Sequence, residues 1–203
     1  MVHFMLALCY FIGAFPPGYI VAKLWKGIDI REHGSGNIGF TNVLRVLGKK
    51  AGIITLICDV GKGVLAVYVA TYAASGVESP TIFALYRAIG GALAIIGHNW
   101  PVFIGFRGGK GVATSLGVFL GLAPIATLIA TGIWIFLLLI SNMVSLSSII
   151  TAALLPLIIF ATHYSIVYIV IGILMAVMII IRHKSNIARI IRGEENKFFK
   201  KAR

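Results

Sequence analysis

The chain of 203 residues is too apolar and too poor in charge to be a water-soluble domain. Hydrophobic residues make up 59% and charged residues 12%, with a mean hydropathy of +0.99, whereas a soluble domain carries about 25% charged residues. A net charge of +12 could suit nucleic acid, but the basic residues gather in short breaks between apolar runs. That distribution is typical of loops facing an anionic cytoplasmic leaflet, so no nucleic-acid partner is expected.

The first three predicted membrane spans are apolar runs separated by polar breaks, at 4–22, 51–73 and 81–97. The break after the first run and the break after the third are both basic, and two spans lie between them. The loop 74–80 between the second and third runs carries Glu78 and no basic residue, which suits the outer side.

A continuous apolar region at 112–181 completes the membrane part of the chain. It is too long for two spans of about 20 residues and fits four compact ones. Its breaks are marked by Pro124, by Ser141-Asn142 and by residues 161–165. The basic tail then lies on the same side as the other basic segments, with seven spans, the N-terminus outside and the C-terminus in the cytoplasm.

Lipid offers backbone groups no hydrogen-bond partner, so the predicted fold class is all-α, a polytopic helical bundle. No polar stretch is long enough to fold separately, and residues 1–203 are therefore expected to form a single membrane-embedded domain.

The first polar segment with chemical interest is Gly-Ser-Gly-Asn-Ile-Gly at 34–39, which continues to Arg45. Gly34 and Gly36 allow backbone N–H groups to approach an anion closely, and Arg45 supplies a charged fork suited to phosphate. The neutral donors of this segment are Ser35, Asn37, Thr41 and Asn42. The alternative interpretation is a flexible glycine turn between helices.

The second segment contains His98 and Asn99 and ends in Gly-Gly-Lys-Gly at 108–111, directly before an apolar run. Lys110 and the N–H groups of its glycines would lie at a helix N-terminus, where an anion is attracted. The segment is not a P-loop, because the spacing of that motif is missing. The alternative is a basic loop held against lipid headgroups.

The third segment is Arg-His-Lys-Ser-Asn-Ile-Ala-Arg at 182–189, after the last apolar run. His183 and Asn186 are three residues apart and hence neighbours on one helix face. Alone, a basic tail after a last span would indicate topology only. All three segments are expected at one membrane surface, however, and each offers donors to an oxyanion. Together they predict a lipid or a phosphorylated metabolite as substrate.

These three segments resemble the motifs of the bacterial acyl-phosphate:glycerol-3-phosphate acyltransferase family. The matching stretches lie at 34–45, 97–114 and 183–189, in the order and spacing of the family. The resemblance implies an enzyme of the bacterial cytoplasmic membrane whose active site faces the cytoplasm. It would transfer a long-chain acyl group from acyl phosphate to the 1-hydroxyl of glycerol 3-phosphate, giving lysophosphatidate and inorganic phosphate. This is the first step of phospholipid synthesis.

The resemblance also implies two sets of site residues. The catalytic set is Ser35, Arg45, Lys110, His183 and Asn186. The substrate- or phosphate-binding set is Gly34, Gly36, Asn37, Thr41, Asn42, His98, Asn99, Gly108, Gly109, Gly111, Ser147 and Ser148. Ser35 has no base near it in sequence, which favours a hydrogen-bond donor over a covalent nucleophile. Either His183 or a substrate phosphate oxygen could accept the proton of the attacking hydroxyl.

No metal and no cofactor are expected, because the six acidic residues form no carboxylate cluster. The expected partners are acyl phosphate, glycerol 3-phosphate and membrane lipid, and the oligomeric state is open, with a monomer compatible. Asp59 and Lys62, three apart in the second span, are expected to form a structural ion pair, with a functional role for these intramembrane charges as the alternative. Glu195 is expected to anchor the tail by pairing with a basic neighbour.

The competing functional class is a transporter or channel for a phosphorylated solute. Such a protein would share the spans and the basic glycine loops. Against it, all polar segments are expected on one side of the membrane, whereas alternating access needs a set on each side. The enzyme is therefore the favoured prediction.

Overall fold

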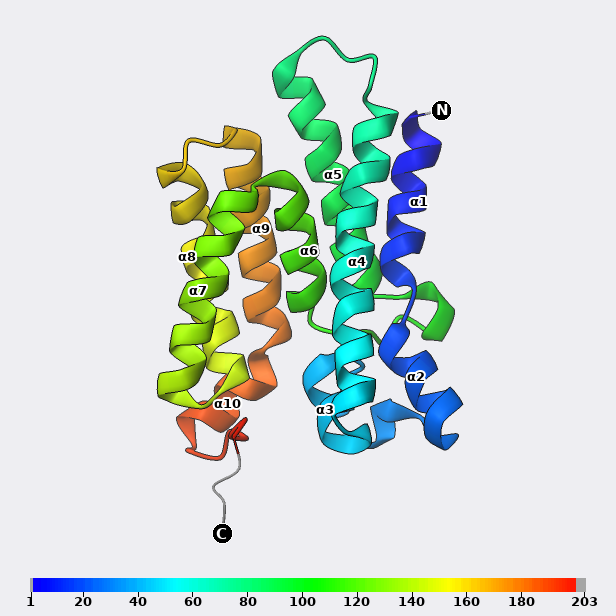
Figure 1. Cartoon of the computed structure of the whole chain (residues 1–203), viewed down its shortest axis with the longest axis vertical. Coiled ribbons are helices and arrows are strands. Elements are labelled where there is room, and N and C mark those ends of the chain that lie inside the picture. Colours follow the sequence, from blue (N-terminus) through cyan, green and yellow to red (C-terminus); the bar gives the residue numbers. More distant parts are fainter. Residues whose placement is uncertain (1, 200–203) are drawn as a thin grey trace. The chain divides into compact units, whose positions relative to one another are not determined.

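Every regular element that the computed structural model describes, over residues 2–199, is a helix (Figure 1). The helices form two compact units, Met1–Leu122 and Ala123–Arg203. The all-helical membrane fold is confirmed. The single domain remains a prediction, because compact packing of a group of helices does not by itself make it a separate domain.

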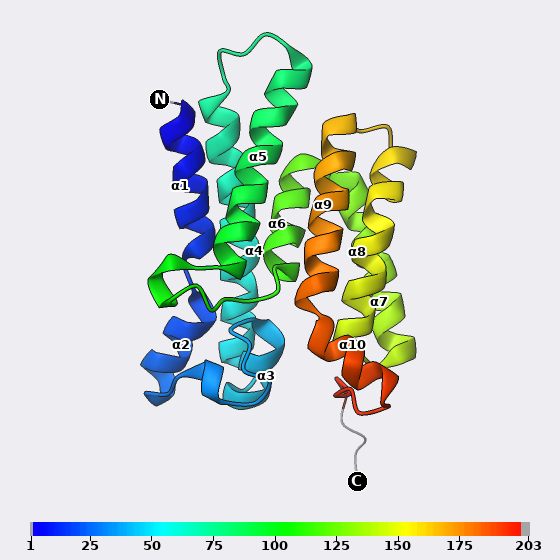
Figure 2. The ribbon, with the colours of Figure 1, turned by 180° about the vertical axis from the view of Figure 1, so that it is seen from behind.

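Unit 1 contains the first two polar segments. Its elements are α1 (Val2–Ala14), α2 (Pro17–Lys26), η1 (Ile30–Glu32), α3 (Phe40–Leu47), α4 (Lys49–Ala73), α5 (Pro80–Asn99), η2 (Val102–Ile104) and α6 (Val112–Leu122). The helix predicted over 4–22 is broken at Phe15-Pro16, since proline has no N–H for a helical hydrogen bond. Within this unit, α2, α3 and the α5–α6 connection lie away from the N-terminus (Figure 2).

Close helix packing in unit 1 depends on small residues. A Cβ added at Gly13 or Gly97 would overlap the backbone of the facing helix in the α1–α5 pair. The same holds for Gly63 and Gly117 between α4 and α6. Small residues at helix interfaces let backbones approach in lipid, where the hydrophobic effect does not drive association. These contacts hold in place the helices whose ends are joined by the polar segments.

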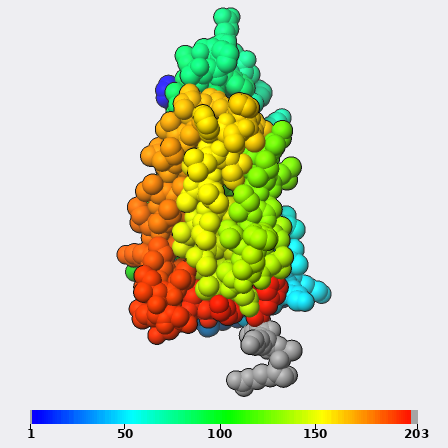
Figure 3. Space-filling model, turned by 90° about the vertical axis from the view of Figure 1, so that its left-hand side faces the viewer, coloured from blue at the N-terminus to red at the C-terminus, as the bar shows by residue number. Residues whose placement is uncertain are grey.

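Unit 2 consists of α7 (Pro124–Ser141), α8 (Val144–Ala161), α9 (Ile166–Arg182) and α10 (Lys184–Ile191). In it α8 lies between α7 and α9, with the C-terminal segment at one end (Figure 3). The three breaks predicted in the apolar region 112–181 are confirmed, since α6, α7, α8 and α9 are separate helices. A bend of 60° separates α9 from α10.

The predicted count of seven spans stays a prediction, because helix length by itself supports fewer. Among the described residues, five helical stretches are long and apolar enough to cross a membrane, or up to six with the bent pair α9–α10. The predicted span that fails this length criterion is the fourth, α6, whose 11 residues rise about 16 Å, short of the roughly 30 Å hydrocarbon core. Hydropathy does not reveal this, because Thr114 and Ser115 are the only polar residues between Gly111 and Pro124.

Candidate active site

The first polar segment is a loop folded around one buried side chain, Asn42 of α3. The amide Nδ2 of Asn42 donates to the carbonyl oxygens of His33 at 3.0 Å and Asn37 at 2.8 Å. Its Oδ1 accepts from the Ser35 backbone N–H at 2.8 Å. Gly34 has a φ of +62°, and a Cβ there would also overlap Asn42 Oδ1. Asn42 thus has a structural task in the loop, and its contact with substrate remains a prediction.

The same loop presents its polar groups outward. Ser35 is exposed, while Asn37 Oδ1 accepts from the Gly39 N–H at 2.8 Å at the start of α3. Thr41 lies in the first turn of α3, and Arg45 is exposed in its last turn. The loop therefore offers a hydroxyl, and the last turn of α3 offers a guanidinium.

Arg31, just before the first segment, connects this part of the chain to the second segment through one backbone contact and is itself held by a salt bridge. The Arg31 guanidinium binds Asp29 through Nε and Nη2, the latter at 2.7 Å from Oδ2. Its Nη1 donates to the Ile104 carbonyl of η2 at 2.7 Å. The hydrogen bonds from Arg31 hold the pKa of Asp29 at about 2. Because this folded pKa is depressed, the stabilisation is present above pH 4 or so and is lost only as pH falls towards about 2.

The second segment folds back onto the end of α5 through its glycines. The Gly109 N–H donates to the His98 carbonyl at 3.0 Å. A Cβ at Gly108 would overlap the carbonyl oxygens of His98 and Asn99, and one at Gly111 would meet the Asn99 side chain. The glycines expected to face an anion are thus also required for packing against α5. Lys110 is half-buried directly before α6, as predicted.

His98 faces the interior of unit 1 rather than open solvent. Its Nδ1 lies 2.8 Å from Lys62 Nζ and 3.3 Å from Asp59 Oδ1. Lys62 and Asp59 form the predicted ion pair at 2.8 Å, three residues apart on α4. The participation of His98 is not visible in the sequence, because no spacing rule connects α4 with the end of α5.

A carboxylate from the tail, Glu195, lies against the third segment, with its side chain 6% exposed. Glu195 Oε1 accepts from Ser145 Oγ at 2.8 Å and from Asn186 Nδ2 at 2.7 Å. Its Oε2 accepts from Arg189 Nε at 2.8 Å, which confirms that Glu195 anchors the tail. Burial raises the pKa of Glu195, but the hydrogen bonds from Asn186, Ser145 and Arg189 outweigh it and lower the pKa overall.

His183 connects α9 and α10 and is 3% exposed. Its Nδ1 lies 2.8 Å from the Ile179 carbonyl. A carbonyl oxygen only accepts, so Nδ1 carries a proton, and in the neutral ring Nε2 has the lone pair. The Asn186 N–H donates to the His183 carbonyl at 2.8 Å, which places the two predicted residues in one turn.

The serines of α8 lie in the interior of unit 2. Ser147 Oγ donates to the Met143 carbonyl at 2.9 Å, and Ser148 Oγ donates to the Val144 carbonyl at 2.8 Å. Trp134 Nε1 donates to Ser148 Oγ at 3.0 Å. One helical turn of α8 thus contains both predicted serines together with Ser145, which lies outside the predicted site.

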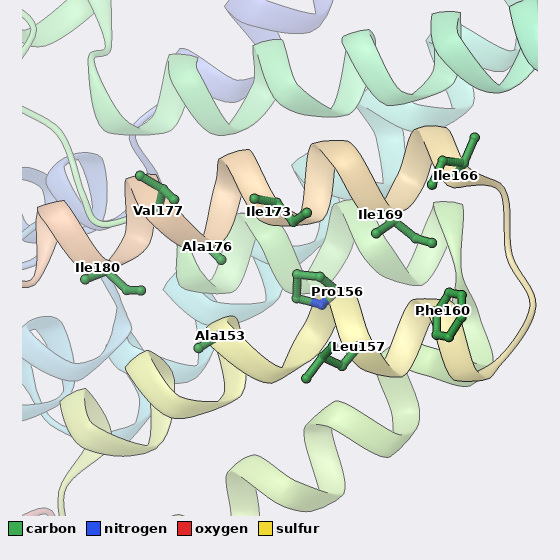
Figure 4. A pocket seen from close by; sticks show the side chains of 10 residues that line it. All are labelled: Ala153, Pro156, Leu157, Phe160, Ile166, Ile169, Ile173, Ala176, Val177 and Ile180. Atoms are coloured by element: carbon green, nitrogen blue, oxygen red, sulfur yellow. The ribbon is translucent and has the colours of Figure 1, made fainter.

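An apolar groove of about 400 Å³ runs between α8 and α9 (Figure 4). Along α9 it extends from Ile166 to Ile180, which is roughly 21 Å at the rise of an α-helix. Ile180 is three residues before His183. On α8 the lining begins at Ala153, five residues after Ser148.

The structure brings the predicted residues together in two groups. Unit 1 contains Ser35, Arg45 and Lys110 with the glycines of both loops, and unit 2 contains His183, Asn186, Ser147 and Ser148. Additional polar residues in these groups are Asp29, Arg31, Asp59, Lys62, Ser145 and Glu195. Over residues 2–199, no group of three His, Cys, Asp or Glu side chains could hold a metal ion.

The helices and glycine loops define an integral, multi-pass membrane protein whose polar segments suit phosphorylated ligands. A family model described as glycerol-3-phosphate acyltransferase matches residues 3–193, and the chain belongs to that family. Relatives named glycerol-3-phosphate acyltransferase include one from Fusobacterium nucleatum, 45% identical over 95% of this chain and 96% of its own length. Another from Staphylococcus saprophyticus is 46% identical over 97% and 98%.

Two solved structures are similar over almost the whole chain. A crystal structure of PlsY (YgiH), an integral membrane glycerol 3-phosphate acyltransferase in its glycerol 3-phosphate form, is 36% identical, with a TM-score of 0.88. The match covers 98% of this chain and 96% of that one. The lysophosphatidic acid form of PlsY gives a TM-score of 0.85. The family prediction and the enzyme prediction are confirmed, and the transporter alternative is set aside.

Proposed function

We propose that this enzyme transfers a long-chain acyl group from acyl phosphate to the 1-hydroxyl of glycerol 3-phosphate, releasing lysophosphatidate and inorganic phosphate. The observation that carries the proposal is the pair of anchored glycine loops in unit 1, which offer Ser35, Arg45 and Lys110 as donors for phosphate. The similar PlsY structures contain glycerol 3-phosphate and lysophosphatidic acid. We further place the enzyme in the bacterial cytoplasmic membrane, with its active site facing the cytoplasm.

The donor supplies a good leaving group, because acyl phosphate is a mixed anhydride. The protein then mainly has to hold two anions close together and direct the hydroxyl at the carbonyl carbon, which can contribute several kcal/mol. Arg45 and Lys110 would offset the repulsion between the two phosphates and stabilise the departing one. Ser35 would donate a hydrogen bond to phosphate. No metal is required for these steps.

The proposal is tested by measuring phosphate release from palmitoyl phosphate by the purified protein, with and without glycerol 3-phosphate. Release should depend on glycerol 3-phosphate, with lysophosphatidate formed in equal amount. Arg45→Ala should lower both rates roughly 10- to 100-fold, the effect of losing a charged hydrogen bond of about 1.5–3 kcal/mol. Lys49→Ala, which removes an exposed cation four residues away, is the matched control and should leave both rates unchanged. No release by folded, lipid-supplied protein would refute the reaction.

The acyl chain of the donor is assigned to the groove between α8 and α9 (Figure 4). Three features support this assignment. The lining is apolar, the groove extends for the length of several helical turns, and its Ile180 end lies one turn from His183. A fatty chain bound there would have its head end beside the polar residues of unit 2. Ordinary membrane lipid is the alternative occupant.

Ala153→Phe tests this assignment, because Ala153 is exposed and lines the groove near its polar end. A phenyl ring there should obstruct the chain and raise the KM for palmitoyl phosphate about tenfold, or about 1.4 kcal/mol, with the KM for glycerol 3-phosphate unchanged. Ala161→Phe makes the same change at an exposed position of α8 that does not line the groove. Equal kinetics for the two variants would show that the groove holds only bulk lipid.

A further inference from the structure

Three ionisable side chains meet in the interior of unit 1: Asp59 and Lys62 from α4, and His98 from the end of α5. Each is at most 6% exposed. Lys62 Nζ lies 2.8 Å from Asp59 Oδ1, 2.8 Å from His98 Nδ1 and 2.9 Å from the Phe15 carbonyl oxygen. An ammonium group has three N–H donors and no acceptor, so Lys62 can donate to His98 Nδ1 and to the Phe15 carbonyl while its charge pairs with Asp59.

The geometry favours one tautomer of His98, because its Nδ1 is nearer to Lys62 Nζ, at 2.8 Å, than to Asp59 Oδ1, at 3.3 Å. Because Lys62 donates to Nδ1, that nitrogen is the acceptor, and the single proton of a neutral imidazole is on Nε2. A neutral ring leaves the group of Asp59, Lys62 and His98 with no net charge. A second proton on the ring would add an uncompensated charge in the interior, which is strongly unfavourable.

The Nε2 side of the ring faces the second glycine loop. A Cβ at Gly109 would overlap the His98 imidazole, with Nε2 as its nearest atom. The Gly109 N–H also donates to the His98 carbonyl at 3.0 Å. His98 therefore contacts Gly109 with both its ring and its backbone, and Lys110 is the next residue along the chain.

We propose that Asp59 and Lys62 are positioning residues for the acyl transfer. They fix His98 as the Nε2–H tautomer against Gly109, and this contact sets the backbone that carries Lys110. The inference rests on the proposed function, because it acts through Lys110. An ion pair that only joined helices would not depend on the tautomer of His98. Groups that orient an active residue from behind are commonly needed for its geometry.

The first test is the tautomer of His98 in the wild-type protein, read by NMR with 15N-labelled histidine in lipid nanodiscs. His98→Gln identifies the His98 signals by their loss. We expect a pyridine-type Nδ1 and a pyrrole-type Nε2. The opposite assignment, or two pyrrole-type nitrogens, would overturn the proposal. The tautomer is read in the wild-type protein, with His98→Gln serving only for assignment, and the measurement does not depend on the reaction.

The second test is the double variant Asp59→Asn/Lys62→Met, which removes both charges together and so leaves no uncompensated one. We expect a melting temperature near that of the wild type, loss of the single His98 tautomer, and at least a tenfold fall in kcat/KM for glycerol 3-phosphate. A folded double variant with native kinetics, or with the native His98 spectrum, would overturn the proposal. If the wild-type protein had no acyltransferase activity, the proposed function would be refuted. The tautomer of His98 would still test whether Asp59 and Lys62 orient its ring.

The matched control is Arg87→Met, which removes another intramembrane cation from the same unit. Arg87 Nε donates to Thr71 Oγ1 at 2.9 Å, and its Nη2 donates to the Gly121 carbonyl at 2.6 Å. It precedes His98 by a stretch of α5 that rises roughly 16 Å. This variant should keep the His98 spectrum and the native kcat/KM, whatever it does to stability. If Arg87→Met changed the His98 spectrum and kcat/KM as the double variant does, the effect would be a general consequence of losing an intramembrane charge.

Discussion

Gly108→Ala should lower kcat/KM for glycerol 3-phosphate about 100-fold. The new Cβ would overlap the backbone carbonyl oxygens of His98 and Asn99 and the Pro101 ring. Backbone atoms at the end of α5 cannot rotate away, so the loop must shift, and Lys110 is two residues further on. A displacement of about 1 Å at a catalytic group can lower the rate 100-fold. The same overlap should destabilise the fold by about 1–3 kcal/mol. Steady-state kinetics and thermal melting in detergent measure the two effects.

Gly61→Ala is the control for this prediction. It makes the same substitution in α4 of the same unit, where a Cβ would meet nothing within 4 Å. Alanine in a helix is favoured over glycine by about 1 kcal/mol, so the control should be at least as stable as the wild type. Native activity in Gly108→Ala would show that the loop tolerates the shift, and that Lys110 does not depend on its packing against α5.

Helix boundaries could be predicted well from the sequence, because lipid imposes long apolar runs and prolines interrupt them. Pro124 begins α7, and the Ser141-Asn142 break ends it. The status of α6 could not be predicted in the same way. Its apolar residues continue the pattern of a span, and only the start after Gly111 and the end at Leu122 show how short the helix is.

The polar segments were predicted as groups of donors, but the sequence could not separate ligand-facing residues from those that build the loop. Asn42 looks like a phosphate donor in sequence, yet its amide is hydrogen-bonded to the turn around it. Arg31 and Asp29 lie outside the motifs, and only the contact with Ile104 reveals that they connect two loops. Such long-range partners leave no periodic signal, so they appear only in the three-dimensional structure.

His183→Asn should lower kcat by at least about 100-fold, with little change in the KM for glycerol 3-phosphate. An asparagine amide can keep the hydrogen bond to the Ile179 carbonyl that Nδ1 makes, but it offers no basic nitrogen at the position of Nε2. General base catalysis contributes about 10²- to 10⁴-fold, and this would be lost. Lys184→Ala, at the exposed neighbouring position, should leave kcat unchanged. A variant with nearly native kcat and a raised KM would contradict this prediction. Proton acceptance would then belong to a substrate phosphate oxygen, and His183 would only orient the substrate. The two roles differ because a base acts on the chemical step, whereas an orienting donor already acts on the bound ground state.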